Sequence, residues 1–254
     1  MQNPEKSWFG EKEVSAEEKT EGVIGVFDSV ASRYDIMNDF MSGGLHRIWK
    51  DQFIRMIRPR ATIAGRPADY LDVAGGTGDI AFRIRKKIGA GANITLCDLN
   101  NNMLSIGRDR AIDKGWVNDF DWVTGNAESL PMPDNSVDIY TIAFGLRNVT
   151  HIDTALSEAL RVLRPGGKFF CLEFSHVQPK ILAKAYDAYS YNVIPRIGEH
   201  IANDRDSYQY LVESIRKFPN QRKLAKRLEN AGFKRVKYNN FTAGIVAVHQ
   251  GLKA

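Results

Sequence analysis

This chain of 254 residues lacks the features that define several classes of protein. It has only two cysteines, Cys97 and Cys171, and both fall in apolar runs, so we expect reduced core residues and no disulfide framework. No group of histidines and cysteines has the spacing of a metal site, and we expect no metal. No apolar run approaches the roughly 18 residues that a membrane-spanning helix requires. These absences argue against a disulfide-stabilised domain, a zinc module and an integral membrane protein.

The chain also lacks a strong excess of charge of either sign. It has 35 basic and 30 acidic residues, which gives a formal net charge of +5. No basic run with interleaved aromatic residues is present, and this argues against a nucleic-acid partner. The N-terminal segment has no apolar signal core, and its Glu5, Glu11 and Glu13 are not typical of an organellar transit peptide. We therefore expect a cytoplasmic protein.

The first 58 residues precede the predicted sheet. Residues 1–21 are polar and charged, and we expect them to form a loosely held arm. In residues 22–58 apolar side chains recur at three- and four-residue intervals, which predicts helices, and the glycines at 43 and 44 interrupt the pattern. We therefore predict that residues 1–58 form an arm and a helical cap.

From residue 59 onward, short apolar runs alternate with helical patterns. A helical insertion rich in tyrosine interrupts this alternation at about 179–217. The pattern predicts an α/β fold with a doubly wound, mostly parallel seven-stranded sheet in a single domain, 59–254. The expected strands lie near 68–73, 94–98, 120–124, 137–143, 168–174, 235–240 and 244–249, and helices are expected after Asp79 and at about 101–114, 153–163 and 220–231.

A glycine-rich turn follows the first of these strands. Residues 71–78 read Leu-Asp-Val-Ala-Gly-Gly-Thr-Gly, and the second strand ends in Asp98. Glycines let the backbone approach a ligand closely. A carboxylate at the end of the second strand can accept hydrogen bonds from both hydroxyl groups of a ribose. The turn alone fits NAD, FAD or S-adenosylmethionine. The dinucleotide pattern Gly-x-Gly-x-x-Gly is absent, which favours the sulfonium cofactor.

Two stretches resemble motifs of class I methyltransferases. Residues 71–78 are similar to the first motif, and we expect Asp72 to brace the turn, with direct contact to a ligand as the less favoured alternative. Residues 125–128 (Gly-Asn-Ala-Glu), with 131–138 after them, resemble the stretch that binds adenine. The resemblance implies a Rossmann-like fold and S-adenosylmethionine as cofactor. The residues that it assigns to the cofactor are Gly75, Gly76, Thr77, Asp98, Asn126 and Ala127, with Met103 either on the adenine or in the core.

Two longer blocks resemble the signatures of the ubiquinone/menaquinone biosynthesis C-methyltransferases of the UbiE type. They are residues 34–49, from Tyr-Asp-Ile-Met-Asn to His-Arg-Ile-Trp, and residues 161–175, which contain Arg-Pro-Gly-Gly-Lys. Residues 144–149 (Phe-Gly-Leu-Arg-Asn-Val) and 208–215 also look like that family. The resemblance extends from about residue 22 to the C-terminus. It has two departures, which are Arg164 where the family usually has lysine and Ala143 where some relatives have serine.

The resemblance implies methyl transfer to a ring carbon of a polyprenylated hydroquinone, either demethylmenaquinol or a 2-methoxy-6-polyprenyl-1,4-benzoquinol. Arg147 and Asn148 are the expected catalytic residues, because their loop lies where acceptors meet the methyl group in this fold. Arg147 would lower the pKa of the phenol and position a water, or else form a structural salt bridge. Substrate contacts are expected from Tyr34 and Asn38 in the cap, and from Tyr186 and Ile194 in a groove for the isoprenoid tail, unless that stretch is ordinary core.

Partners and alternatives follow from the same resemblance. It implies association with other quinone-biosynthesis enzymes, a homodimer and transient, peripheral contact with the inner face of the membrane. Methylation of another small phenolic or sterol-like molecule is a second interpretation, and a non-catalytic scaffold that binds S-adenosylmethionine is a third. The intact glycine turn, Asp98 and Arg147 argue against lost catalysis.

Overall fold

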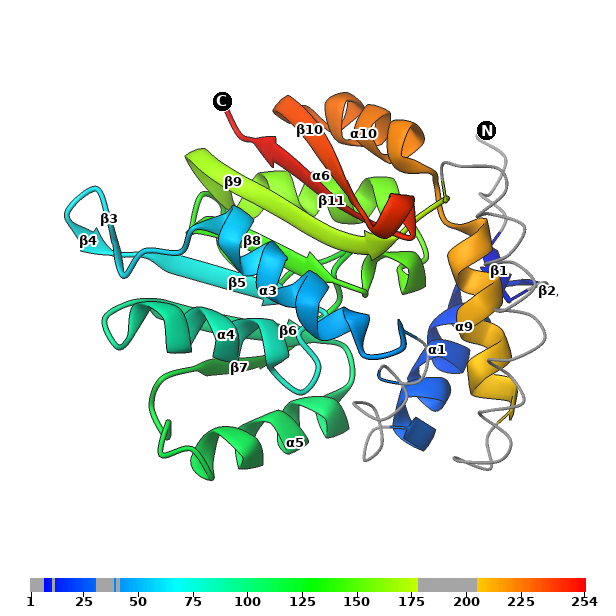
Figure 1. Cartoon of the computed structure of the whole chain (residues 1–254), viewed down its shortest axis with the longest axis horizontal. Helices are drawn as coiled ribbons and strands as arrows, with labels where there is room; N and C mark the ends of the chain where they lie inside the picture. Colours follow the sequence, from blue (N-terminus) through cyan, green and yellow to red (C-terminus); the bar gives the residue numbers. More distant parts are fainter. Residues whose placement is uncertain (1–6, 11, 31–38, 40–41, 178–204) are drawn as a thin grey trace.

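The computed structural model describes residues 7–10, 12–30, 39, 42–177 and 205–254 (Figure 1). The strands of its main sheet are β5 (Asp69–Val73), β6 (Asn93–Asp98), β7 (Asp121–Thr124), β8 (Val137–Ala143), β9 (Leu163–Phe174), β10 (Lys234–Phe241) and β11 (Val246–Leu252). Their order across the sheet is β10-β11-β9-β8-β5-β6-β7. The pairs from β9 to β7 are parallel, and β11 and β10 are antiparallel. This confirms the predicted doubly wound, mostly parallel seven-stranded sheet.

Helices cover both faces of the sheet. The described helices are α1 (Ala16–Val30), α3 (Leu45–Ile57), α4 (Asp79–Ile88), α5 (Asn101–Ile112), α6 (Ile152–Val162), α9 (Arg205–Lys217) and α10 (Gln221–Asn230), with short 3-10 helices η2 (Leu146–Asn148) and η3 (Thr242–Gly244). Buried side chains of α3, α4 and α5 share one core cluster with the sheet, and those of α6 and α10 share another. Helices α1 and α9 lie together beyond one end of the sheet (Figure 1).

The N-terminal arm is more ordered than its composition predicts. Strands β1 (Ser7–Phe9) and β2 (Lys12–Val14) pair as a hairpin, and α1 begins at Ala16 and not near residue 22. Ser15 Oγ accepts the backbone N–H of Glu18 (3.1 Å), and Glu18 Oε2 accepts the N–H of Ser15 (2.8 Å). This reciprocal capping box begins the helix. The expectation of a loose arm over residues 1–21 is therefore wrong for its described part.

Two further details differ from the expected elements. Strand β9 begins at Leu163 and not near residue 168, because its first residues continue the pairing with β8 across an irregularity in register. A small hairpin of β3 (Thr62–Ile63) and β4 (Arg66–Pro67) precedes the sheet, and no pattern predicted it. Helix α9 confirms the helical end of the expected insertion at 179–217. Residues 178–204 lie outside the described residues.

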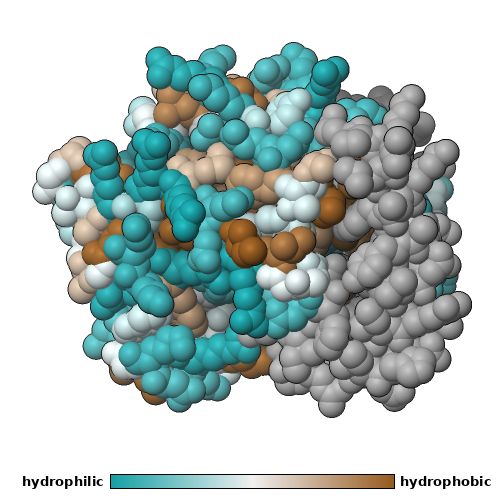
Figure 2. Space-filling model, viewed as in Figure 1, coloured by the Kyte–Doolittle hydropathy of each residue, from teal (hydrophilic) through white to brown (hydrophobic). Residues whose placement is uncertain are grey.

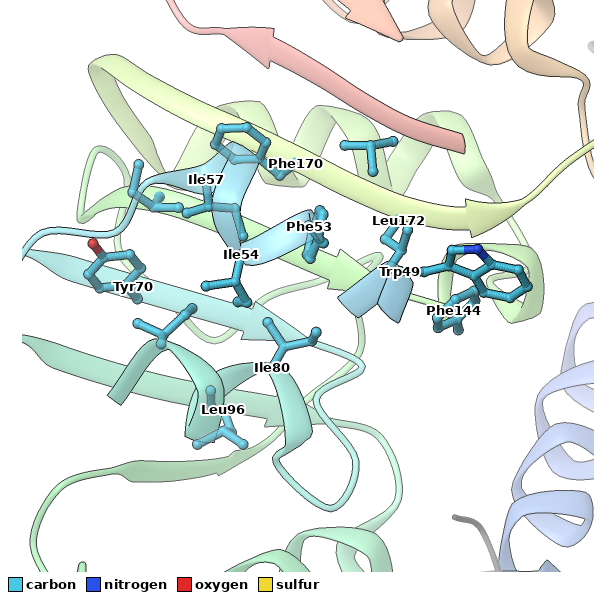
Figure 3. Close-up of a cluster of buried hydrophobic side chains, with 14 of the residues drawn as sticks. Trp49, Phe53, Ile54, Ile57, Tyr70, Ile80, Leu96, Phe144, Phe170 and Leu172 are labelled. Carbon is cyan, nitrogen blue, oxygen red and sulfur yellow. The ribbon is translucent and has the colours of Figure 1, made fainter. Parts of the chain in front are cut away.

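Helix α3 packs an aromatic face on the sheet (Figure 3). Trp49, Phe53 and Ile57 recur every four residues and are almost fully buried. The ring of Phe53 meets that of Phe170 edge-on at 6.4 Å between centroids. Trp49 Nε1 donates to Thr242 Oγ1 (2.8 Å), which satisfies the one polar atom of the indole. This helix therefore anchors the cap to the sheet. In the view of Figure 1, the coloured part of the surface is largely hydrophilic, with small hydrophobic areas (Figure 2).

Replacing Phe53 with alanine tests this anchor. We expect Phe53→Ala to lower the free energy of unfolding by about 3–5 kcal/mol, because it removes a fully buried ring and leaves a cavity. Urea unfolding followed by circular dichroism measures the change. Ile48→Ala on the outer side of the same helix, where the side chain is 53% exposed, is the control and should cost about 1 kcal/mol or less. Equal losses in both variants would contradict the packing.

Candidate active site

A cavity lies where the strand order of the sheet reverses. The chain leaves β5 toward β6 on one side and later returns as β8 on the other, so the carboxyl ends of β5 and β8 diverge there. One side of the cavity is lined by residues at or after the carboxyl ends of four strands, β5, β6, β7 and β8. Helix α1 lines the other side. The lining residues from the sheet side are Val73, Ala74, Gly76, Asp98, Leu99, Asn100, Met103, Gly125, Asn126, Ala127, Glu128, Ala143, Phe144, Gly145, Asn148, Val149 and Thr150.

Helix α1 forms an apolar wall of this cavity. Val23, Ile24 and Phe27 line it at helical spacing. Lys19, one turn earlier, is buried and its Nζ donates to the carbonyl oxygen of Val149 (2.9 Å). Burial lowers the pKa of this lysine, and nearby Glu128 opposes the shift. The hydrogen bond ties α1 to the loop that follows η2. The apolar spacing of this helix was visible in the sequence, but its position over the cavity was not.

The turns after β5 and β8 touch each other. A Cβ added at Gly145 would lie 2.4 Å from the Cβ of Ala74, so no larger residue fits there. Ala74 and Phe144 both have positive φ angles, 51° and 56°. A non-glycine residue adopts this conformation at a cost of roughly 1–3 kcal/mol, and such strain concentrates at functional sites. Both strained residues line the cavity.

Asp98 is fixed at the cavity wall by two backbone groups. Its Oδ2 accepts the N–H of Gly76 (2.8 Å), and its Oδ1 accepts the N–H of Asn100 (2.8 Å). Burial raises the pKa of this carboxyl group, and the backbone hydrogen bonds oppose the rise. Gly76 has φ of 52°, and a Cβ there would lie 3.2 Å from Met103 Cε. The glycine turn and the carboxylate therefore form one rigid unit with acceptor capacity left on both carboxylate oxygens.

Asp72 lies beneath the glycine turn and does not line the cavity. Thr141 Oγ1 donates to its Oδ1 (2.7 Å), whereas Oδ2 has no hydrogen-bond partner among the described residues. A Cβ at Gly75 would lie 3.0 Å from the carbonyl oxygen of Asp72. Burial raises the pKa of Asp72 to about 7. Asp72 therefore joins β5 to β8 beneath the turn, and its role in bracing the turn stays a prediction.

The six residues assigned to the cofactor divide into two groups. Gly76, Asp98, Asn126 and Ala127 line the cavity. Gly75 and Thr77 do not line it, and the buried Thr77 hydroxyl accepts a hydrogen bond from Arg110 Nη1 (3.1 Å). These residues fit S-adenosylmethionine. The carboxylate of Asp98 suits the ribose diol, the amide of Asn126 and the backbone of Ala127 suit the edge of the adenine, and Met103 offers an apolar surface beside them.

The two residues expected to be catalytic point in different directions. Asn148 lines the cavity, and its Oδ1 accepts the hydroxyl of Tyr210 (3.0 Å). Arg147 does not line it. Its side chain is 3% exposed, and its Nη1 donates to Glu173 Oε1 (2.8 Å) and to the carbonyl oxygen of Phe144 (2.5 Å). The Arg147–Glu173 salt bridge is therefore present, as the alternative interpretation of this arginine predicted.

Glu173 holds the turn that contains Arg147. Its Oε2 accepts the backbone N–H of Arg147 (3.2 Å), in addition to the ion pair. Burial raises the pKa of Glu173 above its usual value, and the guanidinium of Arg147 opposes part of this rise. Sequence reasoning assigned no role to Glu173 or Tyr210, although both lie in blocks that resemble the family.

Glu128 joins two loops at the rim of the cavity. Its Oε1 accepts the backbone N–H groups of Thr150 and His151 (3.0 Å each), and its Oε2 lies 2.7 Å from His151 Nδ1. This carboxylate therefore ties the loop after β7 to the N-terminus of α6, where a negative charge is favourable.

The remaining expectations concern substrate contacts, metals and membranes. The four residues expected to contact substrate lie outside the described residues and are Tyr34, Asn38, Tyr186 and Ile194. No cluster of metal-ligating side chains occurs in the part of the chain that the structure describes. Within the same part, no helix combines the length and apolar character needed to cross a membrane.

Asp72 predicts a pH dependence of stability. Its carboxyl group ionises less readily in the folded chain than in the unfolded chain, so unfolding releases a proton between pH 3.8 and about 7. The contribution of Asp72 to the free energy of unfolding therefore falls as the pH rises through this window. We expect Asp72→Asn to lack that decrease, so that its stability relative to the wild type grows from pH 4 to 7 in chemical unfolding. The control is Asp121→Asn, at an exposed position, whose free energy of unfolding should change with pH as that of the wild type does. If the curve of Asp72→Asn also runs parallel to that of the wild type, Asp72 does not cause the decrease.

The fold and the sequence both have close counterparts among known proteins. A Thermotoga maritima S-adenosylmethionine-dependent methyltransferase, a possible histamine N-methyltransferase, superposes with a TM-score of 0.61 at 19% identity, over 91% of this chain and 99% of that one. Phosphoethanolamine N-methyltransferase 2 of Haemonchus contortus, in complex with S-adenosyl-L-methionine, has a TM-score of 0.57 at 15% identity, over 80% of this chain and 52% of that one. At these identities the likeness shows a shared fold.

The sequence comparisons show the family. The chain is 57% identical over 246 residues to the ubiquinone/menaquinone biosynthesis C-methyltransferase UbiE of Brucella abortus (strain S19), which covers 96% of this chain and 90% of that protein. It is 56% identical to the UbiE of Brucella anthropi, over 96% of this chain and 92% of that protein. Residues 12–253 match the ubiE/COQ5 methyltransferase family. The chain therefore belongs to the ubiE/COQ5 methyltransferase family and is an S-adenosylmethionine-dependent C-methyltransferase.

Proposed function

We propose that this enzyme methylates a ring carbon of a polyprenylated hydroquinone in menaquinone or ubiquinone biosynthesis. The acceptor is demethylmenaquinol, 2-methoxy-6-polyprenyl-1,4-benzoquinol or both. One observation carries the proposal. The residues suited to the cofactor and the amide of Asn148 converge on one cavity, and an apolar wall from α1 faces them across it. The printed names of the Brucella relatives support the same class of acceptor.

The cofactor site is built from the ends of β5, β6 and β7. Bound S-adenosylmethionine supplies an electrophilic methyl group on a sulfonium. We assign the ribose hydroxyls to Asp98, whose carboxylate is held by backbone N–H groups and keeps free acceptor capacity. We assign the adenine edge to Asn126 and the backbone of Ala127, and one face of the base to Met103, because all three line the cavity. Gly75 contributes through the shape of the turn, and Thr77 through its hydrogen bond with Arg110.

The acceptor site uses the opposite wall. A quinol ring and the first part of its tail are apolar, and Val23, Ile24 and Phe27 offer an apolar surface beside the cofactor residues. Holding the ring carbon close to the methyl group, and in line with it, removes much of the entropic barrier to transfer. The wall formed by α1 therefore orients the ring.

Asn148 acts on the ring oxygen. A ring carbon becomes a good nucleophile when the neighbouring hydroxyl loses its proton, so the site must stabilise developing negative charge on that oxygen. The Asn148 amide lies on the cavity wall and can donate to it. An amide cannot accept the proton, which we assign to a water molecule. In our proposal Arg147 does not touch the acceptor and instead holds the turn that carries Asn148, through Glu173 and the Phe144 carbonyl.

The nature of the acceptor extends the proposal to location and partners. A polyprenyl tail resides in a lipid bilayer, so the enzyme must reach its substrate by transient, peripheral contact with the inner membrane face. We also propose association with other quinone-biosynthesis enzymes and a homodimer. Contacts from Tyr34, Asn38, Tyr186 and Ile194 remain predictions for the acceptor and its tail.

A methyl-transfer assay tests the reaction. We expect the enzyme in detergent, with labelled S-adenosylmethionine, to methylate reduced short-chain demethylmenaquinone, reduced 2-methoxy-6-polyprenyl-benzoquinone or both. Asn148→Ala should lower kcat by about 100-fold, because it removes a hydrogen bond to charge that develops in the transition state. Asn239→Ala on the exposed surface of β10 is the control. If the cofactor binds and neither quinol is methylated, the acceptor is another small molecule or the chain is a binding scaffold.

A binding measurement tests the cofactor residues. We expect Asp98→Asn to weaken S-adenosylmethionine binding by roughly 10- to 100-fold, because it removes a charged acceptor and turns an N–H group toward a backbone donor. Isothermal titration calorimetry gives the Kd. Exposed Asp113→Asn, at the end of α5, should leave it unchanged. An unaltered Kd in Asp98→Asn would remove Asp98 from the site.

A further inference from the structure

Tyr210 reaches the active site without lining it. It lies on α9, and its hydroxyl donates to Asn148 Oδ1 (3.0 Å) across a sequence separation of 62 residues. The side chain is almost fully buried, and Asn148 lines the cavity whereas Tyr210 does not. Through this hydrogen bond Tyr210 can influence a molecule in the cavity by way of the Asn148 amide.

The structure has one orientation of the amide, with Oδ1 toward the Tyr210 hydroxyl that donates to it. Burial raises the pKa of Tyr210 well above its usual value, so the phenol keeps the proton that it donates. With Oδ1 occupied by this donor, the amino group of Asn148 is the part of the amide left for the cavity. The reverse orientation would turn the amide oxygen toward the acceptor, where it would repel a developing phenolate. Two charged groups that act on the pKa of Tyr210, Arg147 and Glu173, are paired with each other.

The ring of Tyr210 is held independently of its hydroxyl. Phe9 of the N-terminal hairpin stacks on it, with 4.5 Å between ring centroids and 22° between the planes. The neighbouring Leu211 and Val212 of α9 are buried in the core. Removing the oxygen atom alone should therefore leave the ring and the helix in place.

We propose that Tyr210 is a positioning residue for methyl transfer, which holds the Asn148 amide so that its amino group donates to the acceptor's ring oxygen. This inference rests on the proposed function. In the reaction it assists, the ring hydroxyl first gives its proton to water and becomes a phenolate. A bond then forms between the ring carbon and the methyl group, the carbon–sulfur bond breaks with its electron pair going to sulfur, and the phenolate oxygen becomes a carbonyl. The proton on the ring carbon leaves to water, the ring regains its aromatic character and the phenolate oxygen takes a proton back. Tyr210 stabilises the phenolate through Asn148.

The variant Tyr210→Phe tests the proposal in the full-length enzyme. We expect kcat to fall about tenfold, as for the loss of one hydrogen bond, while the Kd for S-adenosylmethionine and the quinol KM stay within about twofold. The rising limb of the kcat–pH profile should move to higher pH, because the phenolate is less stabilised. Tyr210→Phe combined with Asn148→Ala should be no slower than Asn148→Ala alone, since both act through one amide.

A matched control separates positioning from stability. Tyr70→Phe also removes a buried hydroxyl, one that accepts the N–H of Arg60 and donates to its carbonyl oxygen (2.8 Å each), near the amino-terminal end of β5. We expect it to leave kcat and the pH profile unchanged even if it lowers the melting temperature. The proposal is overturned if Tyr210→Phe keeps full kcat, if the effects of the two site variants multiply, or if the pH profile does not move. A wild type that methylates neither quinol overturns the proposed function as well.

Discussion

The contact between the turns after β5 and β8 is the constraint on which the rest of the site depends. Ala74 and Gly145 approach so closely that a single added carbon atom would overlap. Two residues at these turns, Ala74 and Phe144, adopt left-handed backbone conformations that the surrounding sheet must support. The closeness places the start of the glycine turn beside η2, which carries Asn148. Cofactor and acceptor residues can therefore share one cavity.

A buried ion pair stabilises this arrangement from behind. Burying Arg147 and Glu173 carries a large desolvation cost, which is offset only when their hydrogen bonds are satisfied. The Glu173 carboxylate accepts hydrogen bonds from the side chain and the backbone N–H of Arg147. The guanidinium also donates to the carbonyl oxygen of Phe144. The pair therefore fixes both ends of the turn from Phe144 to Arg147. Removing one partner would leave an uncompensated charge beneath the active site.

The prediction of the fold succeeded where the signal was local. Parallel strands buried on both faces are continuous apolar runs, and the runs that end in Asp72-Val73 and Asp98 were placed within a residue or two of β5 and β6. The capping box at Ser15 and Glu18 was equally local, but the charge of the arm concealed it. Strand β9 begins early because it pairs with β8, and that pairing is not local.

The sequence by itself determined the sheet, the glycine turn with Asp98, and the resemblance to the quinone C-methyltransferases. These depend on residue type and spacing along the chain. Only the tertiary structure decided which side chains meet the cavity. Thr77 turns to Arg110 and Arg147 turns to Glu173, whereas Asn148 remains on the cavity wall. The direction of a side chain depends on partners that the fold brings together from distant positions, and no pattern of neighbouring residues specifies those partners.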